Sequence, residues 1–240
     1  MTPAAGLARQ SDILDETLRL TETLARKRER PIWILDIDDT LLSTTRRHLR
    51  ILREFAQEKG LALADLDHGS VRYSITETAK VAGLEEDRAL NELRGYWFER
   101  FFKNEYLAED HPVDGAPQYC RDLLASGAAI YYLTGRDETM RPGTLAALAA
   151  HGFPLADPSY LLLKPEFSTP DREFKEKVLS RLSTSGTVAG GFENEPLHVQ
   201  MLLDIFPRGQ MVLVDTRHSG RPAPPLSGVP RIKDYRRNSG

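Results

Sequence analysis

Five short apolar runs recur along this chain, and each ends at or just before a polar residue. They span residues 31–36, 128–134, 160–163, 186–192 and 210–215. Apolar runs of this length are typical of strands that are buried on both faces of a parallel sheet. A segment with helical spacing of apolar residues precedes each of the last four runs, at 116–126, 143–151, 171–183 and 196–206. This alternation predicts an α/β fold with a doubly wound parallel sheet.

One long interval interrupts the alternation. Residues 44–111 show no convincing strand pattern. Their apolar residues have helical spacing over 44–59 and 87–107, and a weaker one over 74–82. Because this interval follows directly on the first predicted strand, we predict that it forms an all-helical cap inserted into the core.

The remaining chain divides into a core and two terminal segments. We predict an α/β core made of residues 31–43 and 112–220. Residues 1–30 are predicted to form an N-terminal helix, because their apolar residues recur at helical spacing. Residues 221–240 hold four of the fifteen prolines together with polar and basic residues, which predicts an irregular surface tail.

The composition excludes several classes of protein. Of the 240 residues, 40% are hydrophobic and 28% are charged, which is too apolar for a disordered chain. A net charge of −3 gives no electrostatic basis for binding nucleic acid or an acidic membrane. The apolar runs are far shorter than a membrane span, and residues 11–20 are too acidic for a signal-peptide core. The single cysteine, Cys120, excludes an internal disulfide, and we expect a cytoplasmic protein.

Polar residues follow the predicted strands at the edge of the sheet where ligands bind in open parallel sheets. They are Asp36 and Asp38 after the first strand, Thr134 and Gly135 after the second, Lys164 after the third, and Glu193 and Asn194 after the fourth. Two carboxylates in one pocket can divide the roles of nucleophile and proton donor. Acids from two strand ends suit a hard cation such as Mg²⁺, and Thr134 and Lys164 suit phosphoryl oxygens. The residue types therefore predict metal-assisted phosphoryl transfer through an aspartyl-phosphate.

The segments WILDIDDTLL, YYLTGR, LLLKP and GGFENEP, in this order, resemble the four motifs of the haloacid dehalogenase (HAD) superfamily. The resemblance covers roughly residues 31–216. It implies that Asp36 is the nucleophile and that Asp38 is the general acid/base, which protonates the leaving oxygen and then deprotonates the attacking water. It also implies Mg²⁺ bound by the Asp36 carboxylate, the Asp38 backbone carbonyl and an acid of the fourth motif. The residues that would hold the phosphoryl oxygens are Thr134, Gly135 and Lys164.

The fourth motif departs from the family pattern. The family usually supplies an aspartate pair there, whereas this chain has Glu193, Asn194 and Glu195. A glutamate is one methylene longer than an aspartate, and Mg²⁺ demands near-ideal octahedral geometry. We assign the metal to Glu193 with Asn194 assisting, and Glu195 stays open as an alternative ligand.

The resemblance and the residue types together predict a Mg²⁺-dependent phosphomonoester hydrolase whose partner is a small soluble phosphorylated metabolite. Asp38 favours a phosphatase, because the dehalogenases of the superfamily lack that second aspartate. One alternative is a phosphotransferase whose acceptor is not water. Another is a binding protein on a catalytically decayed HAD scaffold, which the unusual fourth motif favours mildly.

Two groups of cap residues have either a structural or a functional interpretation. Arg46, Arg47 and His48 follow the first motif, and we favour a solvated helix face over an anion-binding site. The aromatic residues of segment 96–106 pair at four-residue spacing. For them we favour packing within the cap, or between cap and core, over a substrate-binding role.

Overall fold

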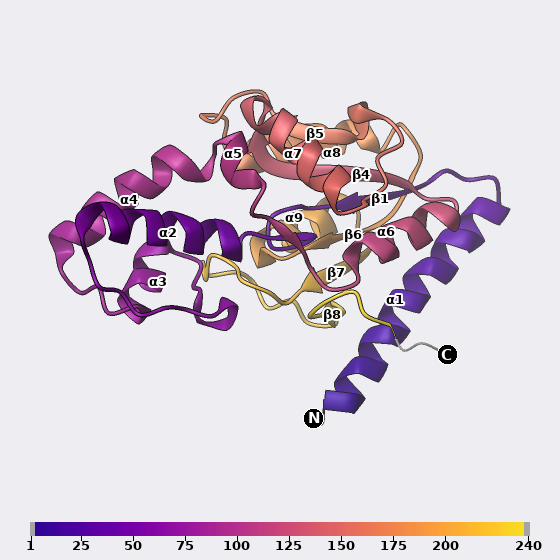
Figure 1. The fold of residues 1–240 in the computed structure, drawn as a ribbon. Helices are drawn as coiled ribbons and strands as arrows, with labels where there is room; N and C mark the ends of the chain where they lie inside the picture. The colour runs from indigo at the N-terminus through magenta and orange to yellow at the C-terminus, as the bar shows by residue number, and fades with distance from the viewer. Residues whose placement is uncertain (1–2, 238–240) are drawn as a thin grey trace.

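Six parallel strands form one sheet, in the order β5-β4-β1-β6-β7-β8 (Figure 1). The strands are β1 (Pro31–Leu35), β4 (Ala129–Asp137), β5 (Leu161–Lys164), β6 (Thr187–Glu193), β7 (Gln210–Val214) and β8 (Arg231–Ile232). All five predicted strands form, which confirms the doubly wound parallel sheet. The strand order reverses at β1, so the chain that leaves β1 lies where open α/β sheets bind their ligands.

The computed structural model describes residues 3–237, with side chains from residue 9 onward. Residues 1–2 of the predicted N-terminal helix and residues 238–240 of the predicted tail lie outside the described residues. None of the helices in the described chain is both long enough and apolar enough to cross a bilayer.

Five long helices cover the two faces of the sheet. They are α1 (Pro3–Arg26), α6 (Ala116–Ala125), α7 (Arg141–Ala150), α8 (Asp171–Leu182) and α9 (Pro196–Ile205). Side chains of β1 alternate between the two apolar layers, as the period of two in a strand requires. Trp33 and Leu35 pack against α1, α6 and α7, whereas Ile32 and Ile34 pack against α8 and α9. The whole of β1 is therefore buried, which explains its uninterrupted apolar sequence.

The inserted segment forms helices that lie to one side of the core, on the left in Figure 1. They are α2 (Thr45–Lys59), α3 (Ile75–Val81), α4 (Asp87–Phe101) and α5 (Asn104–Leu107). α2, α3 and α4 share an apolar cluster of their own. Two short strands, β2 (Leu42–Ser43) and β3 (His111–Pro112), pair antiparallel where the chain leaves and re-enters the core. The predicted helix over 87–107 is interrupted, because Lys103 has extended backbone angles between α4 and α5.

Short 3₁₀ turns complete the described secondary structure. They are η1 (His68–Ser70), η2 (Glu138–Met140) and η3 (Pro158–Tyr160). In each of them the preceding aspartate accepts a backbone N–H through its side chain, as expected for a helix N-cap.

The C-terminal segment is not simply the surface tail that its composition predicts. β8 pairs with β7 and becomes the edge strand of the sheet. Tyr235 is 2% exposed, and its ring packs against Tyr119 and Phe192. Gly115 has φ +79 and lies so close that a Cβ there would be 2.6 Å from the Tyr235 carbonyl oxygen. The sequence did not predict strand β8, because β8 has only two residues and no apolar run.

Candidate functional site

Asp36 lies immediately beyond the central strand. Its N–H donates to the Phe192 carbonyl at 3.0 Å, so it continues the ladder between β1 and β6. Asp39 then adopts φ +56, a left-handed angle that Asp tolerates better than most residues, and the chain turns back. The turn brings the Thr40 hydroxyl to Asp36 Oδ2 at 3.0 Å and to Asn194 Oδ1 at 3.3 Å. Asp36 is thereby fixed and 93% buried, with only 7% of its surface exposed.

Lys175, from the second turn of α8, is the cation that contacts Asp36. Its ammonium lies 3.1 Å from Asp36 Oδ1, 2.7 Å from Glu193 Oε2 and 3.2 Å from His198 Nδ1. Burial and the Glu193 carboxylate raise the pKa of Asp36 to about 7, although Lys175 opposes this. Burial also acts to raise the pKa of Glu193, but Lys175 outweighs it and lowers that pKa to about 2.

Lys164 has different partners from those that the sequence suggests. Its ammonium lies 2.8 Å from Asp171 Oδ1 and donates to the Phe167 carbonyl at 3.1 Å. The position beside the Asp36 carboxylate is taken by Lys175 instead. A signal for Lys175 exists in the sequence, because Lys175 occupies the same helix face as Leu179 and Leu182, which are buried. A lysine on the apolar face of an amphipathic helix needs a buried carboxylate as its partner.

Thr134 and Gly135 lie at the end of β4. Thr134 is fully buried, and its hydroxyl accepts the Arg136 backbone N–H at 3.3 Å. A Cβ at Gly135 would lie 2.8 Å from Asp171 Oδ2, so the chain passes close to the start of α8 there. The side chain of any other residue would push Asp171 away from Lys164.

Asp38 is held by two arginines. Arg136 donates to both of its oxygens, through Nε at 3.0 Å and Nη2 at 2.7 Å, and Arg47 Nη2 donates at 3.0 Å. Burial acts to raise the pKa of Asp38, but Arg136 and Arg47 outweigh it and hold that pKa far below its usual value. The Asp38 side chain remains 34% exposed, so this anion is accessible to solvent.

The cap residues that follow the first motif divide between two environments. Arg46 is exposed, as predicted for a solvated helix face. Arg47 is fully buried, and His48 is only 4% exposed. The interpretation as a solvated face is therefore wrong for Arg47 and His48, because α2 turns these two side chains toward the core and the other cap helices.

The fourth motif directs its side chains in two ways. Glu193 Oε1 accepts the backbone N–H groups of Asn194 and Glu195 at 3.1 and 3.0 Å, which leaves Oε2 for Lys175. The Asn194 amide nitrogen donates to the Arg217 carbonyl, so its oxygen points to Thr40. Glu195, in contrast, accepts the N–H of Ser219 in the loop after β7.

These oxygens suit a hard divalent cation. Within residues 3–237, no three His, Cys, Asp or Glu side chains gather as a metal site. The donors that converge here are two carboxylates, of Asp36 and Glu193, and the amide oxygen of Asn194. Lys175 balances one of the two negative charges, and burial together with the Glu193 carboxylate raises the pKa of Asp36. Mg²⁺ prefers such oxygen ligands, so the donor set fits the ion that the resemblance implies.

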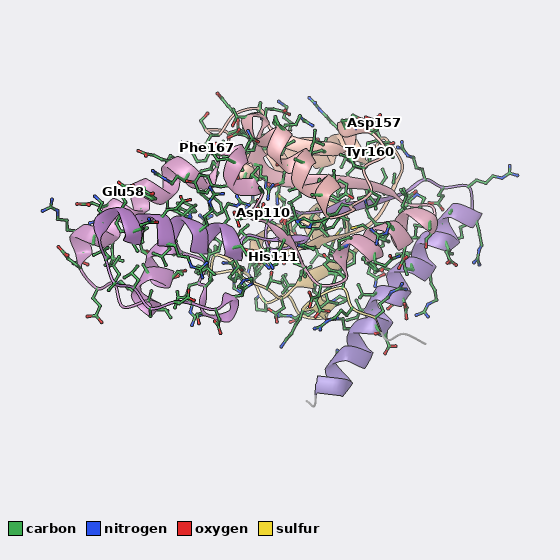
Figure 2. All side chains as sticks on the ribbon, viewed as in Figure 1. Glu58, Asp110, His111, Asp157, Tyr160 and Phe167 are labelled. Atoms are coloured by element: carbon green, nitrogen blue, oxygen red, sulfur yellow. The ribbon has the colours of Figure 1, made fainter. Side chains whose placement is uncertain are left out.

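The aromatic residues of the cap lie against the core. Phe98 and Phe102 of the cap meet Phe167, in the loop after β5, with ring centroids 5.3 and 4.9 Å apart. Trp97 and Phe101 pack instead on the buried His48 ring. Figure 2 labels Phe167 and Asp110 at this junction of cap and core. The predicted packing between cap and core is therefore present.

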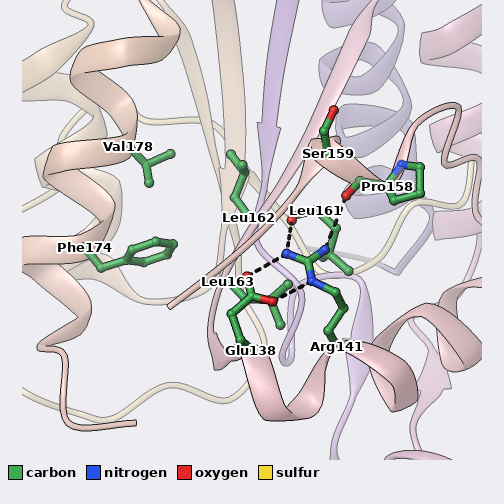
Figure 3. Close-up of a pocket in the computed structure, with 9 residues that line it drawn as sticks. All are labelled: Glu138, Arg141, Pro158, Ser159, Leu161, Leu162, Leu163, Phe174 and Val178. Atoms are coloured by element: carbon green, nitrogen blue, oxygen red, sulfur yellow. Dashed lines mark hydrogen bonds and ion pairs between the residues drawn. The ribbon is translucent and has the colours of Figure 1, made fainter. Parts of the chain in front are cut away.

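A separate pocket of about 330 Å³ lies along β5 (Figure 3). It is lined by Glu138, Arg141, Pro158, Ser159, Leu161, Leu162, Leu163, Phe174 and Val178. Its two charged residues already pair with each other at 2.6 Å, and Arg141 also donates to the Leu161 carbonyl. None of the nine lining residues is a predicted site residue. The chemistry therefore places the candidate active site at Asp36 and not in this pocket.

Comparison with known proteins identifies the fold. No protein-family model and no curated protein matches the chain. A HAD-superfamily hydrolase of subfamily IA from Geobacter sulfurreducens matches with a TM-score of 0.55 at 13% identity, over 86% of this chain and 93% of that one. Protein Tyrosine Kinase A from Mycobacterium tuberculosis matches with a TM-score of 0.55 at 16% identity, over 85% and 93%. A predicted phosphoglycolate phosphatase from Haemophilus somnus matches with a TM-score of 0.54 at 10% identity, over 85% and 94%.

Two structures of a class C acid phosphatase from Bacillus anthracis also match, with TM-scores of 0.47 at 17% and 16% identity. The chain covers 65% and 63% of their length, and they cover 81% and 80% of it. The matches with the higher TM-scores show that this chain has the α/β fold of HAD-type hydrolases, as the motifs lead one to expect for the fold.

Proposed function

We propose that this chain is a Mg²⁺-dependent phosphomonoester hydrolase of the HAD type. The observation that carries the proposal is the meeting of Asp36, Lys175 and Glu193 at the end of the central strand. A buried carboxylate beside a buried ammonium provides a nucleophile and a cation for a phosphoryl oxygen in one place. Some of the structurally similar proteins are named as phosphatases, which supports the same class of reaction.

Asp36 is the proposed nucleophile. One of its carboxylate oxygens attacks phosphorus, the bond from phosphorus to the leaving oxygen breaks, and that oxygen keeps the electron pair and accepts the proton of the neutral Asp38 carboxyl group. Water then attacks the aspartyl-phosphate, gives its proton to Asp38, and the bond from phosphorus to Asp36 breaks. Lys175 and Thr134 hold the phosphoryl oxygens, with Lys175 in the role that the motifs assign to Lys164.

The Mg²⁺ ion would be held by Asp36, Glu193, Asn194 and the Asp38 backbone carbonyl. Bound there, it would neutralise the charge of the phosphoryl group. The anionic Asp36 carboxylate and the anionic phosphoryl group would otherwise repel each other as they approach. Burial raises the pKa of Asp36 to about 7, so a nearby cation is needed to keep the nucleophile ionised at neutral pH.

Asp38 is ready for one of its two proposed roles. Arg136 and Arg47 hold its pKa far below the usual value, so it is an anion and can accept a proton from water. To donate a proton to the leaving oxygen, Asp38 must first be protonated. This requires that the incoming phosphate weaken the hydrogen bonds from Arg136 and Arg47 to Asp38. The second step is therefore the one that this arrangement supports directly.

The cap limits the size of the substrate. Arg47 reaches from α2 to Asp38, and Arg217 reaches from the core to Thr44 at the start of α2. These contacts between cap and core support a small substrate, namely the small soluble phosphorylated metabolite that we propose.

Hydrolysis of p-nitrophenyl phosphate by the purified chain, with and without Mg²⁺, tests the proposal. We expect Mg²⁺-dependent release of phosphate that Asp36→Asn abolishes while the far-ultraviolet circular dichroism spectrum is unchanged. Full activity of Asp36→Asn would contradict the mechanism. A screen of phosphorylated metabolites then identifies the substrate.

Phosphoryl transfer to an acceptor other than water is the second candidate. The structural match to Protein Tyrosine Kinase A from Mycobacterium tuberculosis favours it. The same assay separates the two, because a transferase yields phosphorylated acceptor in place of free phosphate when a tyrosine peptide is added. Ligand binding with no turnover at any Mg²⁺ concentration would instead indicate a binding protein on a decayed scaffold.

A further inference from the structure

Asp110 is a buried carboxylate with no role in the mechanism above. It lies between the cap and the core, next to the start of β3 (Figure 2). Its side chain is fully buried and accepts three hydrogen bonds. Arg47 donates through Nε at 2.8 Å and Nη2 at 2.6 Å, and Arg136 donates through Nη2 at 2.7 Å.

The same two arginines hold Asp38, so the four side chains form one cluster. Arg47 Nη2 and Arg136 Nη2 each bridge the two carboxylates. The two remaining terminal nitrogens are also used, by the Phe101 carbonyl for Arg47 and by the Thr144 hydroxyl for Arg136. Each guanidinium is therefore fixed in plane and direction, and the cluster of two cations and two anions is neutral.

Asp110 is what keeps this cluster neutral. Without its charge, two buried guanidiniums would face the single carboxylate of Asp38. Like charges at this distance repel, and burial weakens the screening by water. The two arginines would then separate, and Asp38 would lose the orientation that their fork geometry gives it.

The other three residues of this cluster come from separate parts of the fold. Arg47 belongs to α2 in the cap, Arg136 to β4 in the core, and Asp110 to the chain that joins them. The Asp110 backbone is itself anchored to the core, because its carbonyl pairs with His151 Nε2 at 2.8 Å. Asp110 thus contacts the core through its backbone and Arg136, and it contacts the cap through Arg47.

We infer that Asp110 is a positioning residue: through Arg47 and Arg136 it aims the Asp38 carboxylate at the water that hydrolyses the aspartyl-phosphate. The inference rests on the proposed function. Asp110 touches no reacting atom. It makes the second chemical step depend on a cap that is seated on the core.

A positioning role and a purely structural role of Asp110 predict different effects on the two steps of the reaction. Nitrophenolate leaves phosphorus without a proton, so phosphorylation of Asp36 by p-nitrophenyl phosphate does not need Asp38. Hydrolysis of the aspartyl-phosphate does need it, because water must lose a proton. Because kcat/KM reports only on the steps through phosphorylation, a defect in the second step lowers kcat and KM together.

The experiment measures pre-steady-state and steady-state kinetics of Asp110→Asn with p-nitrophenyl phosphate and Mg²⁺. We expect kcat to fall about 10- to 100-fold, less than the roughly 10²- to 10⁴-fold cost of losing a general base, because Asp38 is still present but no longer oriented. We expect kcat/KM to stay within about threefold, with a burst of one nitrophenol per enzyme and accumulation of phosphoenzyme. Asp38→Asn should give the same signature with a larger fall in kcat. Asp114→Asn is the matched control, because Asp114 lies nearby with 68% of its side chain exposed, and it should match the wild type.

Parallel losses of kcat and kcat/KM in a folded Asp110→Asn protein, or kinetics equal to those of the control, would overturn the inference. If that variant does not fold, the double variant Arg47→Gln/Asp110→Asn removes one charge of each sign and restores neutrality. It should fold and still show the burst with slow turnover, and a wild-type kcat would refute the role. Wild-type protein that releases no phosphate would instead refute the proposed function and leave no second step to compare.

Discussion

The ammonium of Lys175 lies 3.1 Å from a carboxylate oxygen of Asp36, although the two residues are 139 positions apart in the chain. Lys164, which follows a strand as the motifs lead one to expect, instead pairs with Asp171. We predict that Lys175→Met lowers kcat/KM for p-nitrophenyl phosphate by on the order of 10²- to 10³-fold, because the buried ammonium group that binds a phosphoryl oxygen is lost. Lys164→Met is the matched control and should lose less than about tenfold. Equal losses in the two variants would contradict the assignment.

A second prediction concerns the metal. The carboxylates of Asp36 and Glu193 exceed the charge of Lys175, so a divalent cation should bind and stabilise the folded state. Mg²⁺ at about a hundred times its dissociation constant should add about 2.7 kcal/mol of stability, measured as a rise in melting temperature. Glu193→Gln should remove most of that rise, and EDTA should stop turnover. Glu195→Gln should keep the rise, and its loss there would make Glu195 the ligand.

The stability of the cap should depend on pH through His48. Burial, Arg217 and Arg47 hold the pKa of His48 well below its usual value of 6.5, although Asp38 opposes them. The unfolded chain binds a proton at His48 below pH 6.5 and the folded chain does not, so stability is lost as pH falls below 6.5. At pH 5.5 this loss amounts to about 1.4 kcal/mol.

Urea denaturation at pH 7.5 and 5.5 measures that loss. His48→Leu should reduce the difference in unfolding free energy between the two pH values by about 1.4 kcal/mol. His68→Gln, at an exposed histidine of the cap, is the control and should leave the difference unchanged. An unaltered difference in His48→Leu would mean that His48 is not buried in its neutral form.

Two glycines should respond in opposite directions to the same substitution. A Cβ at Gly190 in β6 would lie 2.1 Å from the Gln210 carbonyl oxygen, whereas one at Gly95 in α4 would meet nothing within 4 Å. Gly190→Ala should destabilise the protein by about 3 kcal/mol or more, because backbone must move. Gly95→Ala should stabilise it by about 0.5–1 kcal/mol through helix propensity. Chemical denaturation checks both, and a neutral Gly190→Ala would show that β6 and β7 are not packed so closely.

The sheet could be predicted from sequence because a strand buried on both faces must be apolar throughout. β1 and β7 show this directly, since nearly all their residues are buried. β8 has two residues, one of them exposed, and forms only because β7 offers it an open edge. Such tertiary pairing leaves no local pattern to recognise.

The site was predictable where it lies on strand ends and not where it depends on helices. Asp36 and Asp38 follow β1 as expected, and Thr134 lies in the C-terminal half of β4. The charged partners Lys175, Arg47 and Asp110 come from two helices and a connecting segment. The spacing of Arg47 and Asp110 resembles that of ordinary surface charges, and only the fold reveals that they are buried against each other, whereas Lys175 lies on the apolar face of its helix.

The place of β1 in the middle of the sheet has a consequence for folding. Its two neighbours, β4 and β6, are both made long after it, and Arg30 and Ser185, which flank the pairing with β6, are 155 residues apart. The chain loses conformational entropy when it closes these large loops, and the stabilising contacts between the strands form only afterwards. This order slows folding. During synthesis the apolar segment Pro31–Leu35 therefore waits without a partner strand, exposed to other nascent chains and to chaperones. The arrival of β6 is the event that both completes the sheet and first brings Glu193 to Asp36.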